Sequence, residues 1–508
     1  ANPRTVNLFN LDLINGSGSD PGNSGGLSID GRAGMLQVNL SNVYVMNNSR
    51  EGFGNRGGGI NLIAHAVPAT SPPGGLLSPM LSLDNGSLIR NNTVSDSGGG
   101  LSCFSNSDTG PVELFVMVGG LIANNEANEG AGLEINGCRG VRIRMAGRLN
   151  FNQPQTGLFN NQATLAGGGL LVRGAAEVVF GGQTFIDINS GGLITGNSAF
   201  FGSAAAVRDQ AILRLENTWV RANQTTGSIG TLSVVASGQL EMSGSGTSAN
   251  CRTPDSIGFL VLPECSVVES NSAFSGSVSA QNGDSRLRIQ RTHVRNNIGS
   301  ATQSASFVIA HSSLYEGPPA TLDIIGTLVY DNQTAEIARI NGNGHLNIIH
   351  ASMVHDGLLL FGLTAQTSQH EARLAARASI LVNESGSGLA GQVLTVPTSA
   401  EAECVLSNVA EANSGFDISS GYLQAGPRFR NAAGADFRLA DDSPAIDYCY
   451  AVAALEDISP DLQGRSRGQA WTGPPPAVPN PGSGLFDLGA LEADLPDRVF
   501  QDRFFEGQ

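Results

Sequence analysis

The sequence predicts an all-β protein, a single right-handed parallel β-helix of roughly a dozen coils followed by a C-terminal capping region. Three observations support this fold. A phrase that combines apolar residues, an Asn and a Gly-rich step recurs along most of the chain. Glycine supplies 66 of the 508 residues and charged residues only 14%, a composition that disfavours helices. Crossovers between parallel strands are almost always right-handed, which sets the expected hand.

The recurring phrase contains two fixed columns of residues. In each copy an apolar residue precedes an Asn by three positions, and a variable turn with a Gly-rich step follows. The apolar column comprises Val45, Ile89, Ile122, Leu158, Ile194, Val220, Val268, Val294 and Val329. The Asn column comprises Asn48, Asn92, Asn125, Asn161, Asn197, Asn223, Asn271, Asn297 and Asn332. Each unit is long enough for three short strands and three turns.

Residues 1–415 are expected to form the stacked coils. One unit cannot bury its apolar face alone, so it must pack on copies of itself. Stacking places equivalent residues about 4.8 Å apart, so the apolar column becomes a core and the Asn side chains can hydrogen-bond as a ladder. Asn also tolerates the left-handed backbone of a sharp turn, and the Gly pairs permit another tight corner.

Charge and hydropathy exclude several classes of protein. The net charge of −16 argues against nucleic-acid binding, which needs a basic surface. The basic residues are all arginine, so lysine-based covalent chemistry is excluded. The chain also lacks an apolar run of about 18 residues, so no transmembrane helix is expected.

The six cysteines indicate disulfides and therefore an oxidising compartment. The sequence contains no C-x-x-C motif, which leaves zinc and thioredoxin-like sites without support. We expect a secretion leader to have been removed before Ala1. The connectivity stays open, and the simplest arrangement pairs the cysteines in sequential order: Cys103–Cys138, Cys251–Cys265 and Cys404–Cys449.

The repeats resemble those of extracellular β-helix proteins with paired GGA(I/L) and FxxN motifs, such as the polymorphic outer-membrane proteins. Residues 99–101 and 168–170 match the first motif. Residues 89–92, 122–125 and 158–161 match the second, with an aliphatic residue in place of Phe. The resemblance covers about residues 1–385. It implies the fold and a location outside the cell or on the outer surface of a Gram-negative bacterium, but no particular activity.

The repeat fades after Cys404, and residues 416–508 form a different region. The phrases SPAID (443–447), DLQGRSR (461–467) and DLGALE (487–492) resemble the C-terminal part of bacterial choice-of-anchor β-helix proteins. A Pro-rich insertion at 474–481 departs from that pattern and is expected to be an exposed loop. An aromatic tail, 499–508, contains Phe500, Phe504 and Phe505 and resembles short aromatic-acidic tails on secreted proteins of some Gram-negative bacteria. These side chains would either cap the open end of the core or act in sorting or self-association.

A polysaccharide-degrading enzyme is the main alternative, because many β-helices cleave acidic polysaccharides. The N-T-D and G-H-G phrases of polygalacturonase-like hydrolases are missing. Aligned columns nevertheless place Arg295, Tyr330 and His355 in one row on coils nine to eleven, with Asp331 and Asp356 beside them. Arg, Tyr and His can serve as donors and bases for proton abstraction next to a sugar carboxylate. All five positions flank a turn, however, where polar residues are expected without any catalytic role.

No cofactor or metal motif is present. The Asp-, Asn- and Gly-rich phrases are compatible with Ca²⁺, but the sequence contains neither an EF-hand loop nor a G-G-x-G-x-D array. A carbohydrate-binding module is disfavoured by the 2 Trp and 6 Tyr, because sugar platforms usually need exposed aromatic side chains.

We therefore expect a secreted or cell-surface structural or adhesive protein. No amphipathic helix precedes the first coil, near Val6–Ile29, in the sequence, so either residues upstream of it form a cap or another molecule covers the open end. The expected partners are copies of the chain, assembled head to tail into filaments, or a component of the cell surface. The alternative function is a polysaccharide lyase or glycoside hydrolase that acts on acidic polysaccharide.

Overall fold

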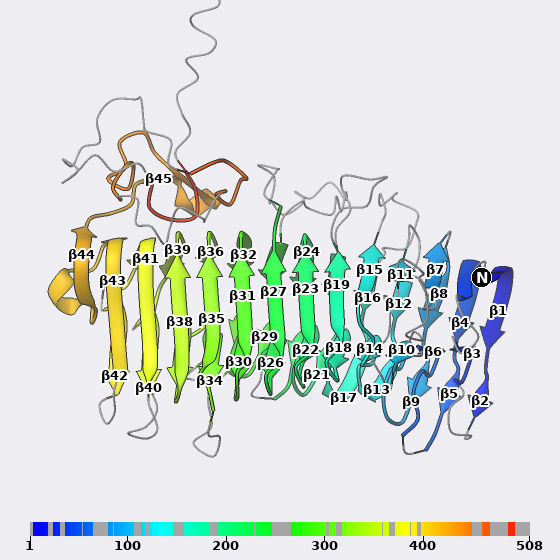
Figure 1. The fold of residues 1–508 in the computed structure, drawn as a ribbon. Coiled ribbons are helices and arrows are strands. Elements are labelled where there is room, and N and C mark those ends of the chain that lie inside the picture. Colours follow the sequence, from blue (N-terminus) through cyan, green and yellow to red (C-terminus); the bar gives the residue numbers. More distant parts are fainter. Residues whose placement is uncertain are drawn as a thin grey trace, which may run out of the picture.

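The structure is a computed structural model that describes residues 4–18, 24–30, 36–52, 54–64, 80–84, 86–105, 113–116, 121–145, 157–181, 192–227, 230–245, 266–300, 304–310, 317–357, 359–364, 371–386, 388–393, 398–449, 460–467 and 486–492. Within these ranges it consists of strands and two short 3₁₀ helices, η1 (Glu411–Asn413) and η2 (Ala432–Gly434). Parallel strands stack along one axis into three sheets, which confirms the predicted parallel β-helix (Figure 1).

Sheet A contains 23 of the described strands. They are β1 (Arg4–Ile14), β4 (Leu36–Met46), β7 (Met80–Asp84), β8 (Leu88–Arg90), β11 (Glu113–Val116), β12 (Leu121–Ala123), β15 (Val141–Met145), β16 (Gly157–Phe159), β19 (Glu177–Gly181), β20 (Gly192–Thr195), β23 (Ile212–Glu216), β24 (Thr218–Arg221), β27 (Gln239–Ser243), β28 (Ser266–Glu269), β31 (Arg286–Gln290), β32 (Thr292–Arg295), β35 (Ala320–Ile325), β36 (Leu328–Tyr330), β38 (Gly344–Ile349), β39 (Ser352–His355), β41 (Ala372–Asn383), β43 (Thr398–Ser407) and β44 (Asp417–Gln424).

Sheet B, with 9 described strands, forms a narrower side of the solenoid. They are β2 (Ser17–Gly18), β5 (Ser49–Arg50), β9 (Thr93–Val94), β13 (Glu126–Glu129), β17 (Gln162–Ala166), β21 (Ser198–Ala199), β25 (Gln224–Thr225), β29 (Ser272–Ala273) and β33 (Ile298–Gly299).

Sheet C, with 12 described strands, completes each coil. They are β3 (Leu27–Asp30), β6 (Ile60–Ile63), β10 (Leu101–Phe104), β14 (Leu133–Asn136), β18 (Leu170–Arg173), β22 (Ala205–Val207), β26 (Leu232–Val235), β30 (Gly276–Gln281), β34 (Ala305–Ala310), β37 (Glu336–Asn341), β40 (Phe361–Thr364) and β42 (Ala390–Val393). We number the coils by these strands, so that β3 belongs to coil one and β42 to coil twelve.

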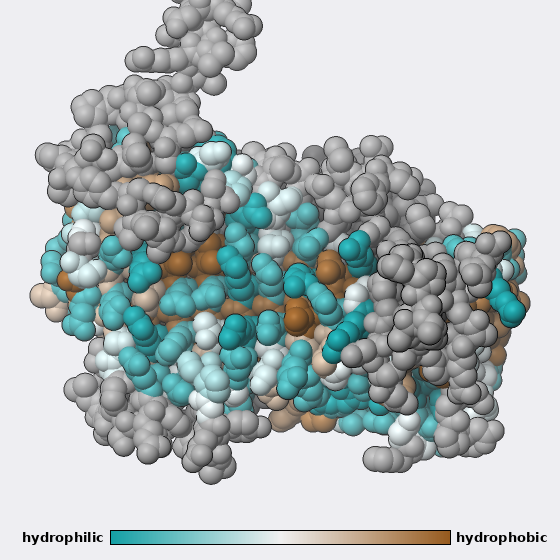
Figure 2. Space-filling view, viewed as in Figure 1, coloured by the Kyte–Doolittle hydropathy of each residue, from teal (hydrophilic) through white to brown (hydrophobic). Residues whose placement is uncertain are grey.

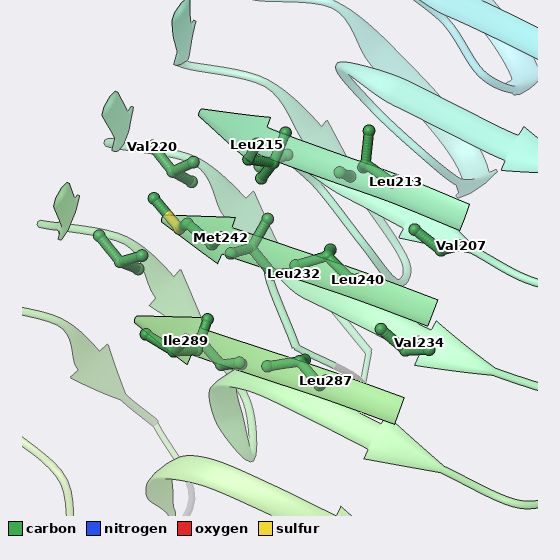
Figure 3. Packing of buried hydrophobic residues seen from close by; sticks show 14 of the residues in the cluster. Val207, Leu213, Leu215, Val220, Leu232, Val234, Leu240, Met242, Leu287 and Ile289 are labelled. Atoms are coloured by element: carbon green, nitrogen blue, oxygen red, sulfur yellow. The ribbon is translucent and has the colours of Figure 1, made fainter. Parts of the chain in front are cut away.

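Inward-facing residues of the sheets fill the axis with one continuous hydrophobic core. Leu213, Leu240 and Leu287 lie in register on β23, β27 and β31, and each is almost completely buried (Figure 3). Val220 points into the same interior from β24. All nine members of the predicted apolar column are fully buried, because each lies directly between equivalent residues of the neighbouring coils.

The Asn column forms a buried ladder along coils two to ten. The Asn125 side-chain amide donates to Oδ1 of Asn161, and Asn161 donates in turn to Asn197, at 3.0 and 2.9 Å. The backbone N–H of Asn125 donates to the same Oδ1 of Asn161. Each side-chain amide also donates to the backbone carbonyl of the apolar-column residue in the preceding coil. For example, the Asn161 amide donates to the carbonyl of Ile122. Each ladder amide therefore satisfies backbone groups that a turn would otherwise leave unpaired.

The left-handed residue of each turn is not the ladder Asn but the residue before it. Asn91, Asn124 and Asn160 have φ values of 53°, 51° and 49°. The tolerance of Asn for left-handed backbone therefore explains the residue in front of the ladder and not the ladder itself. The ladder position instead requires the carboxamide group, which donates and accepts at the same time.

The coils continue beyond the boundary expected at residue 415. Strand β44 pairs in parallel with β43, and Ala402 lies opposite Ile418, so this strand extends sheet A by one more step. The described C-terminal residues then leave the axis, with β45 (Phe429–Asn431) and β46 (Asp436–Leu439) as an antiparallel pair. They lie beside sheet A near β36, β39 and β41, at the end of the rod opposite β1 (Figure 1).

Two of the three sequentially paired disulfides are present. Cys103 is bonded to Cys138 on neighbouring coils, and Cys404 is bonded to Cys449, which ties the C-terminal region to β43. Cys251 and Cys265 lie outside the described residues. The Pro-rich segment 474–481 and the tail residues Phe500, Phe504 and Phe505 also lie outside them.

Candidate functional site

Two of the residues predicted to form a catalytic row are in direct contact. Strands β32 and β36 place Arg295 opposite Tyr330, and Nη1 of Arg295 donates to the Tyr330 hydroxyl at 2.8 Å. Arg295 Nε also donates to Glu269 Oε2 at 3.0 Å from the preceding coil. Three successive coils therefore supply a line of Glu269, Arg295 and Tyr330 on the outer face of sheet A.

The electrostatics of this line do not suit proton abstraction. Burial raises the pKa of Tyr330, although the Arg295 guanidinium acts in the opposite direction. Burial alone would lower the pKa of Arg295, but Tyr330 and Glu269 together raise it. Tyr330 is therefore a neutral phenol and Arg295 a permanent cation at ordinary pH. A general base needs a pKa near the working pH, which neither group has.

The C-terminal region covers this line. The Phe437 ring packs on Tyr330 with 4.7 Å between ring centroids, and Leu328, Leu462 and Leu491 complete an apolar cluster around the pair. Tyr330 is consequently buried. A polysaccharide chain would have to displace Phe437 before it could reach the phenol.

His355 does not join Arg295 and Tyr330, which corrects the predicted row. Val329 of β36 lies opposite Met353 of β39. The position opposite Tyr330 is therefore Val354, and His355 lies one residue beyond it. Successive side chains on a strand point to opposite faces. The column alignment was therefore one residue out at coil eleven.

The surroundings of His355 also differ from those of Tyr330. Burial lowers the pKa of His355, against the opposing influence of the Ala335 carbonyl and the nearby carboxylates of Asp356 and Glu336. Asp331 and Asp356 are exposed, and Asp331 is the left-handed residue of its turn, with φ 52°. Asp331 thus has a local structural role.

The three C-terminal phrases come together into one buried polar network. Asp461 accepts hydrogen bonds from the backbone N–H groups of Gln463, Arg465 and Glu492, at 2.9, 2.7 and 3.0 Å. The Arg467 guanidinium donates to the Glu492 carboxylate at 3.0 Å. Burial, followed by the neighbouring Asp487 carboxylate, raises the pKa of Glu492 to about 8 despite Arg467.

This network docks on the outer face of sheet A. The backbone N–H of Gly489 donates to the Ala378 carbonyl at 2.9 Å, and that of Ala490 to Ser352 Oγ at 3.0 Å. The described C-terminal residues therefore cover the side of the solenoid rather than its open end. A Cβ atom at Gly489 would lie 2.5 Å from Ser352 Oγ, so the close approach requires glycine.

A second charged cluster, on sheet C at coils two to six, was not found from the sequence. Arg173 donates to both Glu129 and Glu134, and Arg208 reaches Glu129 at 2.8 Å. Glu134 also accepts from Ser102 at 2.8 Å. These residues come from four coils and lie on either side of a corner, so no local motif links them. The cluster could have been predicted only from the register of the coils, which shows which residues of neighbouring coils lie side by side.

The cluster is balanced in charge and is completed by Arg56 and Asp96. Arg56 lies 3.9 Å from Glu134 and stacks on the Phe104 ring. Burial, together with the Glu134 carboxylate, raises the pKa of the half-buried Asp96. The two glutamates are held by arginines, so Asp96 is the member of the cluster best suited to donate a proton.

Among the described residues, the face shown in Figure 2 is mostly hydrophilic, with smaller apolar patches between the polar side chains. An open depression of about 320 Å³ is lined by Arg377, Glu401 and Glu403, away from Arg295 and Tyr330. The described residues contain no group of three or more His, Cys, Asp or Glu side chains placed to hold a metal ion. In the described part of the chain, no helix has the length and apolar character needed to cross a membrane.

Comparison with known proteins does not assign the chain to a group. No protein family model matches it, and no curated protein matches its sequence. Its function must therefore be argued from the fold and from the contacts described above.

Proposed function

We propose that this protein is a structural or adhesive β-helix of the cell exterior that assembles head to tail. The observation that carries the proposal is the surface of the first coil. Val6 and Leu11 of β1 lie in register with the buried core residues Val38 and Val43 of β4, yet they are 43% and 38% exposed. Phe9, on the other face of β1, is 61% exposed. A strand edge with exposed core positions is suited to pairing with a further strand.

The last strand of the stack offers a matching surface. One register column of sheet A begins at Val6 and ends at Ile418, and it passes through Val38, Leu81, Leu114, Ile143, Phe180, Leu215, Met242, Ile289, Ile324, Ile348, Ala376 and Ala402. Parallel pairing of β44 with β1 of a second copy would bring Ile418 against Val6 and continue this column. Such a contact is heterologous and generates a filament.

The disulfides support the proposed location. Cys103–Cys138 and Cys404–Cys449 would persist in an oxidising compartment such as the cell exterior. Placement on the outer surface of a Gram-negative bacterium rests on the resemblance of the repeats to extracellular β-helix proteins and of the tail, 499–508, to tails on secreted proteins of such bacteria. Binding to a cell-surface component rests on the long, exposed lateral faces of the rod.

Sedimentation and electron microscopy of the 508-residue protein test the assembly. We expect filaments that lengthen with concentration, and loss of filaments in the double variant Val6→Asp, Leu11→Asp. Asp12→Ser, on the same strand, is the matched control and should assemble normally. A monomer across a wide concentration range would contradict head-to-tail assembly, as would normal filaments from the double variant. Deletion of residues 499–508 separately tests the predicted contribution of Phe500, Phe504 and Phe505 to self-association.

Glycoside hydrolysis is the second candidate, and Asp96 is the observation that favours it. Its raised pKa and its position beside Glu129 and Glu134 are features of a general acid. Release of reducing ends from acidic polysaccharides, abolished in Asp96→Asn but retained in Asp209→Asn, would establish this function in place of the structural one. Absence of such activity across a panel of acidic polysaccharides would eliminate it.

A further inference from the structure

The outward side of sheet B contains a strip without charged residues. We call it the sheet B strip, and it consists of residues 162–165, 198–200, 224–226, 272–274 and 298–300, one segment from each of coils five to nine. Its inward side chains Ala163, Ala199 and Ala273 are buried. An uncharged strip over five successive coils is unusual in a chain with a net charge of −16.

Large apolar side chains project from this strip into solvent. Phe200 and Phe274 are 48% and 50% exposed, and Leu165 and Ile298 are exposed as well. Contiguous exposed apolar surface on a soluble protein marks an interaction site. The strip therefore needs a partner that brings an uncharged, apolar surface of similar shape.

The column of side chains on coils six to eight is symmetric about coil seven. Ala199 pairs with Thr225, and Gln224 pairs with Ser272, so Phe200, Thr226 and Phe274 follow one another in a single column. Phe201 bridges to Ala166, which places Leu165 beside Phe200 on the other side. Coils six and eight thus present Phe, and coil seven presents the smaller Thr226. Ile298 of coil nine lies in the neighbouring column, opposite Ser272.

We propose that the sheet B strip binds the same strip of a second copy, with the two solenoid axes antiparallel. The two-fold axis lies in the contact plane, parallel to the strands, at Thr226. Coil six of one copy then faces coil eight of the other, so that Phe200 lies opposite Phe274, and Leu165 lies over the strand that carries Ile298. Such an isologous contact is closed and gives a pair of rods.

The lack of charge on the strip is compatible with a second copy as the partner. Two strongly acidic molecules repel each other over most of their surfaces, and the uncharged strip allows them to approach closely. Beyond the strip, coil four faces coil ten in this arrangement. The exposed Glu126 then lies near Gln333 of the other copy rather than near an acidic side chain.

The strip spans about 20 Å along the axis, from coil five to coil nine at about 4.8 Å per coil. This is smaller than a standard protein interface, so an isolated pair should be weak. The lateral contact is independent of head-to-tail assembly, because it uses neither β1 nor β44. In a filament, many strips would act together and strengthen the contact.

Cysteine cross-linking tests the symmetry directly. Thr226→Cys lies on the proposed two-fold axis, so it should form a disulfide with its own copy at least ten times faster than Arg288→Cys, an exposed control on sheet A. Adding Phe200→Asp and Phe274→Asp to Thr226→Cys should return cross-linking to the control rate. Equal rates for Thr226→Cys and Arg288→Cys would overturn the proposal.

Mixed samples test the antiparallel arrangement. Phe200→Cys and Phe274→Cys should cross-link with each other when mixed, and neither should cross-link efficiently alone. Efficient cross-linking of Phe200→Cys with itself would show parallel pairing and overturn the model of coil six on coil eight. A far-ultraviolet circular dichroism spectrum identical to that of the parent confirms that each variant is folded. Head-to-tail assembly could fail while Thr226→Cys still cross-links, so the two proposals are separable.

Discussion

The coils and the C-terminal region are stabilised in opposite ways. In the coils, the same contact is repeated: Asn161 accepts from Asn125 and donates to Asn197, and equivalent bonds join its neighbours. In the C-terminal region each contact occurs once, as in the hydrogen bond from Arg467 to Glu492 and the hydrogen bonds of Asp461. Repetition distributes stability over nearest neighbours, whereas the unique network concentrates it in a few groups.

This difference indicates where each region is vulnerable. A coil that is damaged in its core loses contacts on both sides, because each coil supports two neighbours. The C-terminal region instead depends on one disulfide and a few buried polar groups that join it to sheet A. The following substitutions test this contrast, from the largest expected effect to the smallest.

Val220→Asp should cause the largest loss of stability. Val220 is fully buried at the centre of the rod, and its carboxylate replacement would have no ionic partner among the apolar residues around it. We expect a loss of more than about 4 kcal/mol, or failure to fold. Denaturant unfolding followed by circular dichroism measures the effect, with Gln224→Asp on the exposed side of the same coil as control. A loss below 1 kcal/mol would be inconsistent with a packed core at this position.

The double variant Cys404→Ser, Cys449→Ser should release the C-terminal region selectively. The bond closes a separation of 45 residues, and its loss should cost about 2–4 kcal/mol. Hydrogen exchange should accelerate at Leu462 and Leu488, whose amides bond across the docked region, but not at the ladder residues. The corresponding Cys103→Ser, Cys138→Ser variant is the control, since it should loosen coils three and four instead. Uniform acceleration in both variants would argue against two separate modes of stabilisation.

Asn161→Ala should cost about 1–3 kcal/mol, because two buried donors of Asn125 lose their acceptor. Asn48→Ala at the start of the ladder should cost less, since Asn48 accepts only the partly buried N–H of Gly16. Thermal unfolding of the two variants side by side measures the difference. Equal losses would mean that the ladder stabilises its end as strongly as its middle.

The smallest effect on the molecule as a whole concerns pH, because it is confined to the C-terminal region. The pKa of Glu492 rises from 4.5 to about 8 on folding, so between these values the folded state holds a proton that the unfolded state has lost. Stability of the region should therefore fall as pH rises across this window. Glu492→Gln should remove that slope, whereas Glu411→Gln, at an exposed position, should retain it. Hydrogen exchange at Ala490, corrected for intrinsic rates, measures the stability at each pH. If stability depends on pH in Glu492→Gln as it does in the parent, then Glu492 is not the cause of that dependence.

The contrast also explains what the sequence could predict. The ladder and the core column were recognisable because stacking imposes the same residue at the same place in each coil, as at Asn92 and Ile89. The predicted register was wrong where the repeat weakens, so His355 was aligned with Tyr330 although it lies one residue beyond the matching position. The contact of Phe437 with Tyr330 was not predictable, because it joins segments 107 residues apart through packing that occurs once. Likewise, no local pattern shows that Arg173 lies between Glu129 and Glu134.

The Asn ladder also makes the length of the rod adjustable. Each amide meets only its immediate neighbours, and the step from Asn197 to Asn223 is 26 residues. Removal of that one unit would leave Asn161 facing Asn223 with the same donors and acceptors, so the molecule would shorten by about 4.8 Å without a change in its cross-section. Coils can thus be added or removed without changing the cross-section of the rod. A surface that pairs symmetrically about one particular coil, however, requires the number of coils on each side of it to stay the same.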